Sequence, residues 1–150
     1  MLDPILKRLA TLGVPCVAVT LPFMASVAVA ETTEIRVIAG DQVIHASLND
    51  SSASRDFLAQ LPLQIELSDY HSTEKIAYLP KALSTTGMPK AMDPEVGDFT
   101  YFAPWGNIAL FYKDFGYSRG LVKLGEIHPE DINLLQALPK VNVIIERSQP

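Results

Sequence analysis

Cysteine is nearly absent from this 150-residue chain, which contains only Cys16. A single cysteine cannot form an intramolecular disulfide, so the fold must be stabilised by its hydrophobic core alone. The three histidines, His45, His71 and His128, are not spaced as metal ligands. The chain also has no glycine-rich phosphate loop. We therefore predict no metal and no cofactor.

A catalytic nucleophile is not predicted either. Residues 116–120, Gly-Tyr-Ser-Arg-Gly, have the Gly-x-Ser-x-Gly spacing of hydrolases. In those enzymes the serine lies on a strand-to-helix elbow, whereas here we expect a loop between two strands. Asp69, His71 and Glu74 fall in one polar stretch, which a surface turn explains without a metal. No residue is assigned a catalytic role.

Charged residues are absent from Leu9 to Val29, and two basic residues, Lys7 and Arg8, come directly before this apolar run. The run ends in the small-x-small sequence Ala28-Val29-Ala30, which signal peptidases accept. We predict a signal peptide over residues 1–30, cleaved after Ala30. A domain over residues 31–150 would then be periplasmic or secreted, without stable membrane association.

An uncleaved membrane anchor is the alternative, since a spanning helix needs roughly 20 apolar residues. Gly13, Pro15 and Pro22 interrupt the run and disfavour a helix. A cleaved signal peptide is the preferred interpretation.

Positive charge is also scarce: the formal net charge is −5. Loss of Asp3, Lys7 and Arg8 with the signal peptide would make the remainder one unit more negative. Nucleic acids and anionic membrane surfaces both attract proteins through cations. We therefore predict no nucleic-acid partner.

Short strands dominate the rest of the chain, because apolar and polar residues alternate over several segments. We expect strands near residues 34–37, 44–48, 63–67, 76–79, 99–103, 108–112, 121–127 and 141–145. Residues 53–61 and 129–138 have helical spacing of apolar residues and end at prolines. Residues 81–97 are expected to be a long loop with one short strand, and 113–120 a loop. The pattern predicts a mainly β fold, a small closed barrel with two short helices.

Two stretches carry a resemblance to a known family. They are residues 61–80 and 97–125, in which Glu74-Lys75, Pro104-Trp-Gly-Asn107 and Phe111-Tyr112 are the most specific elements. The chain resembles the bacterial cyclophilin-like domain family over roughly residues 33–147. The resemblance implies a cyclophilin-like β-barrel with a helix at each open end. Members of this family also occur beside redox proteins, so a redox protein is an alternative partner.

The residues of proline isomerases with this fold are not matched. Those enzymes use an arginine, a phenylalanine five residues later and a glutamine three further on. Arg55, Phe57 and Gln60 reproduce only the second interval, and the helical pattern buries Phe57. Enzyme activity is therefore not predicted, and peptidyl-prolyl isomerase is kept only as an alternative.

Aromatic residues gather between positions 101 and 117, with cations alongside. Aromatic rings with polar groups suit flat or proline-containing ligands, and a cation can hold a carboxylate. We expect a module that binds a small molecule or an extended peptide; an accessory subunit of an envelope redox protein is the alternative. The predicted ligand-binding residues are Trp105, Tyr117, Arg119, Tyr101, Tyr112 and Lys113.

Glu74 and Lys75 are adjacent and opposite in charge. We expect them to form a surface ion pair that contributes little to stability. The alternative is that Lys75 projects from the start of a strand toward a cleft.

Overall fold

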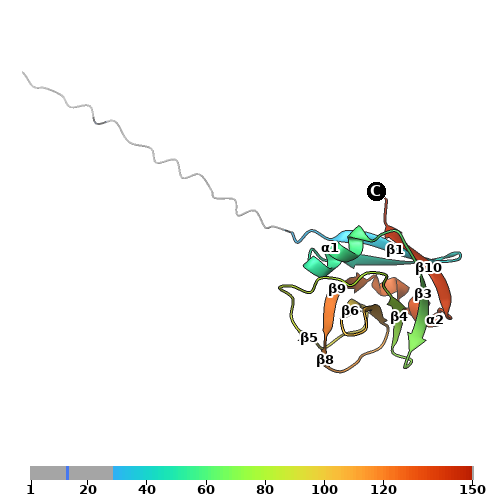
Figure 1. Ribbon diagram of the computed structural model, residues 1–150. Helices are drawn as coiled ribbons and strands as arrows, with labels where there is room; N and C mark the ends of the chain where they lie inside the picture. The colour runs from blue at the N-terminus through green and yellow to red at the C-terminus, as the bar shows by residue number, and fades with distance from the viewer. Residues whose placement is uncertain (1–12, 14–28, 150) are drawn as a thin grey trace, which may run out of the picture.

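The computed structural model describes residue 13 and residues 29–149. Its main strands are β1 (Thr33–Ala39), β2 (Gln42–Leu48), β3 (Leu63–Tyr70), β4 (Glu74–Tyr78), β6 (Asp98–Phe102), β7 (Asn107–Phe111), β9 (Leu121–Ile127) and β10 (Val141–Arg147). They form a closed antiparallel barrel (Figure 1). The strand order around the barrel is β1-β10-β3-β4-β7-β6-β9-β2. The predicted mainly β barrel is confirmed.

The first hairpin shows how the sequence sets the strand register. Gly40 adopts a φ of +61°, which permits the tight turn between β1 and β2. Ile38 is then opposite Val43, and Ile35 opposite Ala46. This register places Ile35 and Ala46 together on the inner side of the barrel, where both are fully buried.

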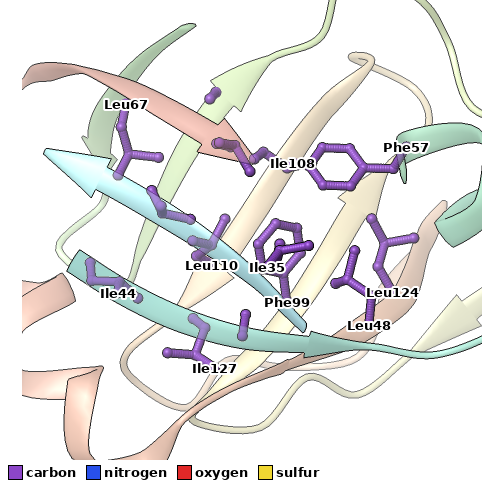
Figure 2. Close-up of a cluster of buried hydrophobic side chains, with 14 of the residues drawn as sticks. Ile35, Ile44, Leu48, Phe57, Leu67, Phe99, Ile108, Leu110, Leu124 and Ile127 are labelled. Carbon is purple, nitrogen blue, oxygen red and sulfur yellow. The ribbon is translucent and has the colours of Figure 1, made fainter. Parts of the chain in front are cut away.

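The interior of the barrel holds the main hydrophobic core. Its fully buried side chains include Ile35, Ile44, Leu48, Phe57, Leu67, Phe99, Ile108, Leu110 and Leu124, which are drawn together in Figure 2. Burial of one such side chain contributes roughly 1.5–3 kcal/mol. The buried members of this cluster run from Ile35 to Ile145, so they all lie within residues 31–150.

Two helices pack against the barrel. Helix α1 (Ser52–Ala59) is capped by Ser51, whose hydroxyl accepts a hydrogen bond from the backbone N–H of Ser54. Phe57 points from α1 into the barrel and lies 5.6 Å from Phe99 between ring centroids. Helix α2 (Ile132–Ala137) follows a 3-10 turn, η1 (Pro129–Asp131), and buries Leu135. Both expected helices are thus present.

A second apolar cluster lies on the outer face of the barrel. Side chains alternate along each strand, so Ala77 and Leu110 face the interior while Ile76 and Ala109 face outward. The other buried members of this outer cluster are Phe111 and Leu121, and the partly buried Tyr70, Met92 and Phe102 pack against it. The outer cluster forms the floor of a surface pocket.

The structure refines two expected loops. Residues 81–97 contain the short strand β5 (Ala91–Met92), as expected, but residues 113–120 are not only a loop. They contain β8 (Ser118–Arg119), which pairs with β5 to form a separate two-stranded sheet. The polar turn expected at 69–74 is confined to residues 71–73, because β3 extends to Tyr70 and β4 begins at Glu74.

Neither helix in the described part of the chain has the length and apolar character needed to cross a membrane. The predicted signal peptide, residues 1–30, lies outside the described residues except for Gly13, Val29 and Ala30.

Candidate functional site

The six predicted ligand-binding residues lie in different surroundings. Tyr101 and Tyr112 are buried, with 1% and 6% of their surface exposed. Trp105, half exposed, lines a pocket on the outer face of the barrel. Tyr117 and Arg119 border a separate hollow. The structure therefore does not bring all six residues into one site.

Tyr101 belongs to the interior of the barrel. Its side chain is part of the main core, and its hydroxyl accepts a hydrogen bond from the backbone N–H of Leu83 at 3.2 Å. Because the ring is buried and its hydroxyl group already has a protein partner, Tyr101 presents no surface to a ligand. We do not retain it in the candidate site.

Tyr112 belongs to a polar network with Lys75 and Asp69. Lys75, 3% exposed, donates to Asp69 Oδ1 at 3.0 Å and to the carbonyl oxygen of Leu138 at 2.7 Å. The hydroxyl of Tyr112 also donates to Asp69 Oδ1. Burial and this hydrogen bond raise the pKa of Tyr112 to about 12, so it stays protonated. The network joins β3, β4 and the end of α2.

The prediction of a surface ion pair between Glu74 and Lys75 is wrong. Consecutive residues of a strand point to opposite faces, so Lys75 faces inward to Asp69 while Glu74 faces outward. Lys75 is also buried rather than exposed. Although burial raises the pKa of Asp69, the hydrogen bonds from Tyr112 and Lys75 outweigh it and lower this pKa.

The pocket that Trp105 lines has a volume of about 220 Å³ and opens on the outer face of β4, β7, β6 and β9. Five aromatic side chains form its walls: Tyr70, Phe102, Trp105, Phe111 and Phe115. The ring of Trp105 is nearly perpendicular to those of Tyr70 (5.6 Å, 84°) and Phe102 (5.4 Å, 80°). We call this the aromatic pocket.

Glu74 is the ionisable group of the aromatic pocket. It enters from the start of β4, opposite Tyr70 on one neighbouring strand and Phe111 on the other. Burial, and to a lesser extent the negative charge of Asp69, raise the pKa of Glu74 to about 7. Among the described residues, no hydrogen bond to the Glu74 carboxyl group offsets the cost of burying its charge. The carboxyl group is therefore free to interact with a ligand.

Asn107 supplies a second polar group from the start of β7. It is 1% exposed, and its Nδ2 donates to the carbonyl oxygen of Ile108 at 3.0 Å. Its Oδ1 is buried without a partner among the described residues. Ser118 also lines the pocket, and its hydroxyl donates to the carbonyl oxygen of Gly116 at 3.4 Å. Among the described residues, no histidine lines the pocket together with Ser118.

Tyr117 and Arg119 border a hollow of about 450 Å³ together with Pro89, Lys90 and Ala91. The pairing of Ala91 with Arg119 across β5 and β8 brings these residues together. Tyr117 is 70% exposed. Lys113 lines neither this hollow nor the aromatic pocket, and its Nζ is 5.9 Å from the centre of the Tyr112 ring.

His45 and His128 stack on each other with 5.8 Å between ring centroids. His45 Nδ1 lies 2.9 Å from Asp131 Oδ2, and His128 Nε2 lies 2.9 Å from Glu34 Oε2. Burial opposes ionisation of Asp131, but the hydrogen bonds from His45 outweigh it and lower the pKa of Asp131. Within the described residues no group of three or more potential ligands is placed to hold a metal ion.

A sequence model of the cyclophilin-like family matches residues 37–146. The chain belongs to this family. The comparison with curated proteins gives no match.

A solved structure supports the fold of this cyclophilin-like domain. It is the solution structure of a hypothetical protein from Archaeoglobus fulgidus, with a TM-score of 0.59 and 16% sequence identity. The match covers 81% of this chain and 98% of the archaeal one. At this identity the likeness shows the fold alone.

Sequence reasoning missed Glu74, Asn107 and Tyr70 as pocket residues, whereas Phe111 and Phe115 lie in the aromatic segment 101–117 that it singled out. The sequence did contain an indication of an outer apolar layer, because the expected strands near 99–103 and 108–112 are apolar on both faces. A barrel strand of this kind needs a cover on its outer face as well as a core within. The sequence alone did not show which segments form that outer layer.

Proposed function

We propose that this cyclophilin-like domain is a binding module that takes a small ligand, or one side chain of an extended peptide, in the aromatic pocket. The observation that carries the proposal is the pocket itself: five aromatic walls surround the carboxyl group of Glu74, which has no hydrogen-bond partner among the described residues. Pockets with apolar walls and a few converging polar groups are typical of ligand sites.

Exposure of the aromatic walls supports the proposal. Trp105 is 50% exposed and Phe115 46% exposed. Contiguous apolar surface in contact with water is costly and commonly marks a binding site. The volume of about 220 Å³ is below the roughly 300–1,000 Å³ of drug-sized ligand sites, which favours a small group over a whole flavin or nucleotide.

The module is further proposed to act outside the cytoplasm, because of the signal-peptide pattern over residues 1–30. Cell fractionation followed by N-terminal sequencing tests this point. A product that begins at Glu31 in the soluble envelope or secreted fraction is expected. A full-length product retained in the membrane would contradict cleavage after Ala30.

Binding is tested by thermal unfolding of residues 31–150 against amines, carboxylates, alcohols, proline peptides, flavins and nucleotides. A ligand present at about 100 times its dissociation constant adds about 2.7 kcal/mol, which raises the midpoint by roughly several degrees. Trp105 is the only tryptophan, so its fluorescence reports on the pocket in the same samples. Absence of any shift would contradict the proposal and favour a protein partner, such as a redox protein.

Isomerase activity gains no support from the residues that suggested it. Phe57 is fully buried, and Arg55 pairs with Asp50 at 2.7 Å on the surface of the domain. A protease-coupled assay on an Ala-Pro peptide tests this alternative directly. Rates equal to those of uncatalysed isomerisation are expected.

A further inference from the structure

The carboxyl group of Glu74 lines the aromatic pocket and accepts hydrogen bonds, but it has no donor among the described residues. Asn107 lines the pocket as well, but its Nδ2 is bonded to the carbonyl oxygen of Ile108 and its Oδ1 is buried, so neither atom faces a ligand. A carboxylate that is partly removed from water is costly when it has no donor. A ligand that donates hydrogen bonds would recover this free energy.

Cationic side chains of the described residues are missing from the lining of the aromatic pocket. Lys75, the next residue along β4, faces the opposite side of the strand and is bonded to Asp69 and Leu138. The negative charge that Glu74 carries when ionised therefore has no counter-ion in the pocket lining. A positively charged ligand would supply it.

The aromatic walls beside Glu74 also favour a cation. Tyr70 and Phe111 are its register partners on β3 and β7, and Phe115 lies 6.1 Å from Phe111 between ring centroids. The face of an aromatic ring attracts a cation within about 6 Å of its centre. The formal net charge of −5 attracts cations to the protein as a whole.

Glu74 and Asn107 lie at opposite ends of the pocket floor. Phe111, opposite Glu74, is four residues from Asn107 along β7, about 13 Å between their Cα atoms. Since both side chains line one pocket, the site is elongated and fits a chain better than a compact ion.

We propose that the aromatic pocket binds a small protonated amine, with its ammonium group at Glu74 and its carbon chain directed along the aromatic walls toward Asn107. This inference rests on the proposed function and names the class of ligand. Glu74 supplies the opposite charge, and the rings enclose the carbon chain.

Three probes of equal chain length test the inference: hexylammonium, hexan-1-ol and hexanoate, titrated into residues 31–150 at pH 8 and constant ionic strength. The fluorescence of Trp105 reports binding. The dissociation constant of hexylammonium is expected to be at least tenfold lower than that of hexan-1-ol, and hexanoate should bind most weakly. The amine stays protonated at this pH, like a lysine side chain.

Glu74→Gln keeps the shape of the side chain and removes its charge. It is expected to reduce the preference for hexylammonium over hexan-1-ol to less than twofold. Glu66→Gln is the matched control, because Glu66 pairs with Lys140 on the surface and does not line the pocket. This control should keep the full preference. Thermal unfolding of each variant confirms that it is folded.

The outcomes separate the two proposals. Equal binding of hexan-1-ol and hexylammonium by the unmodified protein would overturn the amine inference and leave the aromatic pocket as a binding site. No response to any of the three probes would overturn the inference and remove the support for the pocket as well. Tighter binding of Nα-acetyl-lysine methylamide than of hexylammonium would overturn the small-molecule assignment in favour of a peptide lysine.

Discussion

Glu74 and Lys75 are neighbours in sequence, but their side chains lie on opposite sides of the barrel wall. The buried Lys75 bonds to the carbonyl oxygen of Leu138 and to the partly exposed Asp69, whereas Glu74 enters the aromatic pocket. One strand thus supplies a structural cation to the inside and a carboxyl group to the pocket outside. Substitution of the two residues should therefore have different consequences.

Stability should depend on the protonation of Glu74. Its pKa is about 7 in the folded protein, against an ordinary value of 4.5. Between these pH values the folded state keeps a proton that the unfolded state has lost, so the free energy of unfolding falls as the pH rises through this window. Glu74→Gln should be more stable than the unmodified protein at pH 8, by about 1 kcal/mol after allowance for partial exposure.

Thermal unfolding from pH 4 to pH 8 measures this effect. The two proteins should unfold at similar temperatures at pH 4 and diverge as the pH rises. Glu66→Gln should show no such divergence, since its carboxylate is 53% exposed. If the unmodified protein became more stable than Glu74→Gln at pH 8, the raised pKa would be contradicted.

Lys75→Met tests the inner network. Methionine keeps the apolar stem but leaves the carbonyl oxygen of Leu138 and one oxygen of Asp69 without this donor. We expect a loss of about 1–3 kcal/mol of unfolding free energy, measured by denaturant titration. Lys140→Met is the control, because Lys140 is 67% exposed in its pair with Glu66, and should change stability by about 0.5 kcal/mol or less. Equal effects of the two substitutions would contradict a structural role for Lys75.

Gly125→Ala tests the closure of the barrel between β2 and β9. A Cβ at Gly125 would lie 2.0 Å from the carbonyl oxygen of Ser47 and 2.7 Å from the Cα of Leu48. Both are backbone atoms, so the strands would have to separate, at a cost of about 3 kcal/mol or more. Gly116→Ala meets no atom within 4 Å and should fold normally. Calorimetry of both variants compares their unfolding free energies. A Gly125→Ala protein as stable as Gly116→Ala would contradict the close approach of β2 and β9 at Gly125.

Asn107→Leu should change stability and binding only slightly. It removes a buried amide oxygen that has no partner among the described residues, but also the hydrogen bond from Nδ2 to the carbonyl oxygen of Ile108. The two effects oppose each other, so stability should change by about 1 kcal/mol or less. Affinity for hexylammonium should change less than twofold, because the amide oxygen that is removed is buried and the ammonium group lies at Glu74. Unfolding and fluorescence titration measure the two effects. A loss of stability above about 2 kcal/mol would assign Asn107 a structural role instead.

The barrel could be predicted from the sequence because the patterns that determine its strands and turns lie within short segments of the chain. Alternation in segments such as 34–37 and 63–67 fixes which side chains face inward, and Gly40 permits a tight turn. Burial of Phe57 followed from helical spacing in the same way. Each of these inferences depends on residues close together in the chain.

The site could be predicted only in part because it depends on contacts between distant segments. The loop position of Trp105 suggested an accessible ring, and this ring does line the pocket. Tyr101 lies among the aromatic residues of the same segment, but strand alternation turns its side chain into the core of the barrel. Glu74 is a pocket residue only because the fold places Phe111 and Phe115 beside it.

The most direct test of the central claim is the indole N–H signal of Trp105 in a two-dimensional NMR titration of residues 31–150. The chain has one tryptophan, so the signal is unambiguous. A ligand that raises the unfolding midpoint should shift this signal in a saturable way, together with the backbone signals of Glu74, Asn107 and Phe115. A stabilising ligand that leaves Trp105 unchanged and shifts only Tyr117 and Arg119 would contradict the aromatic pocket as the binding site.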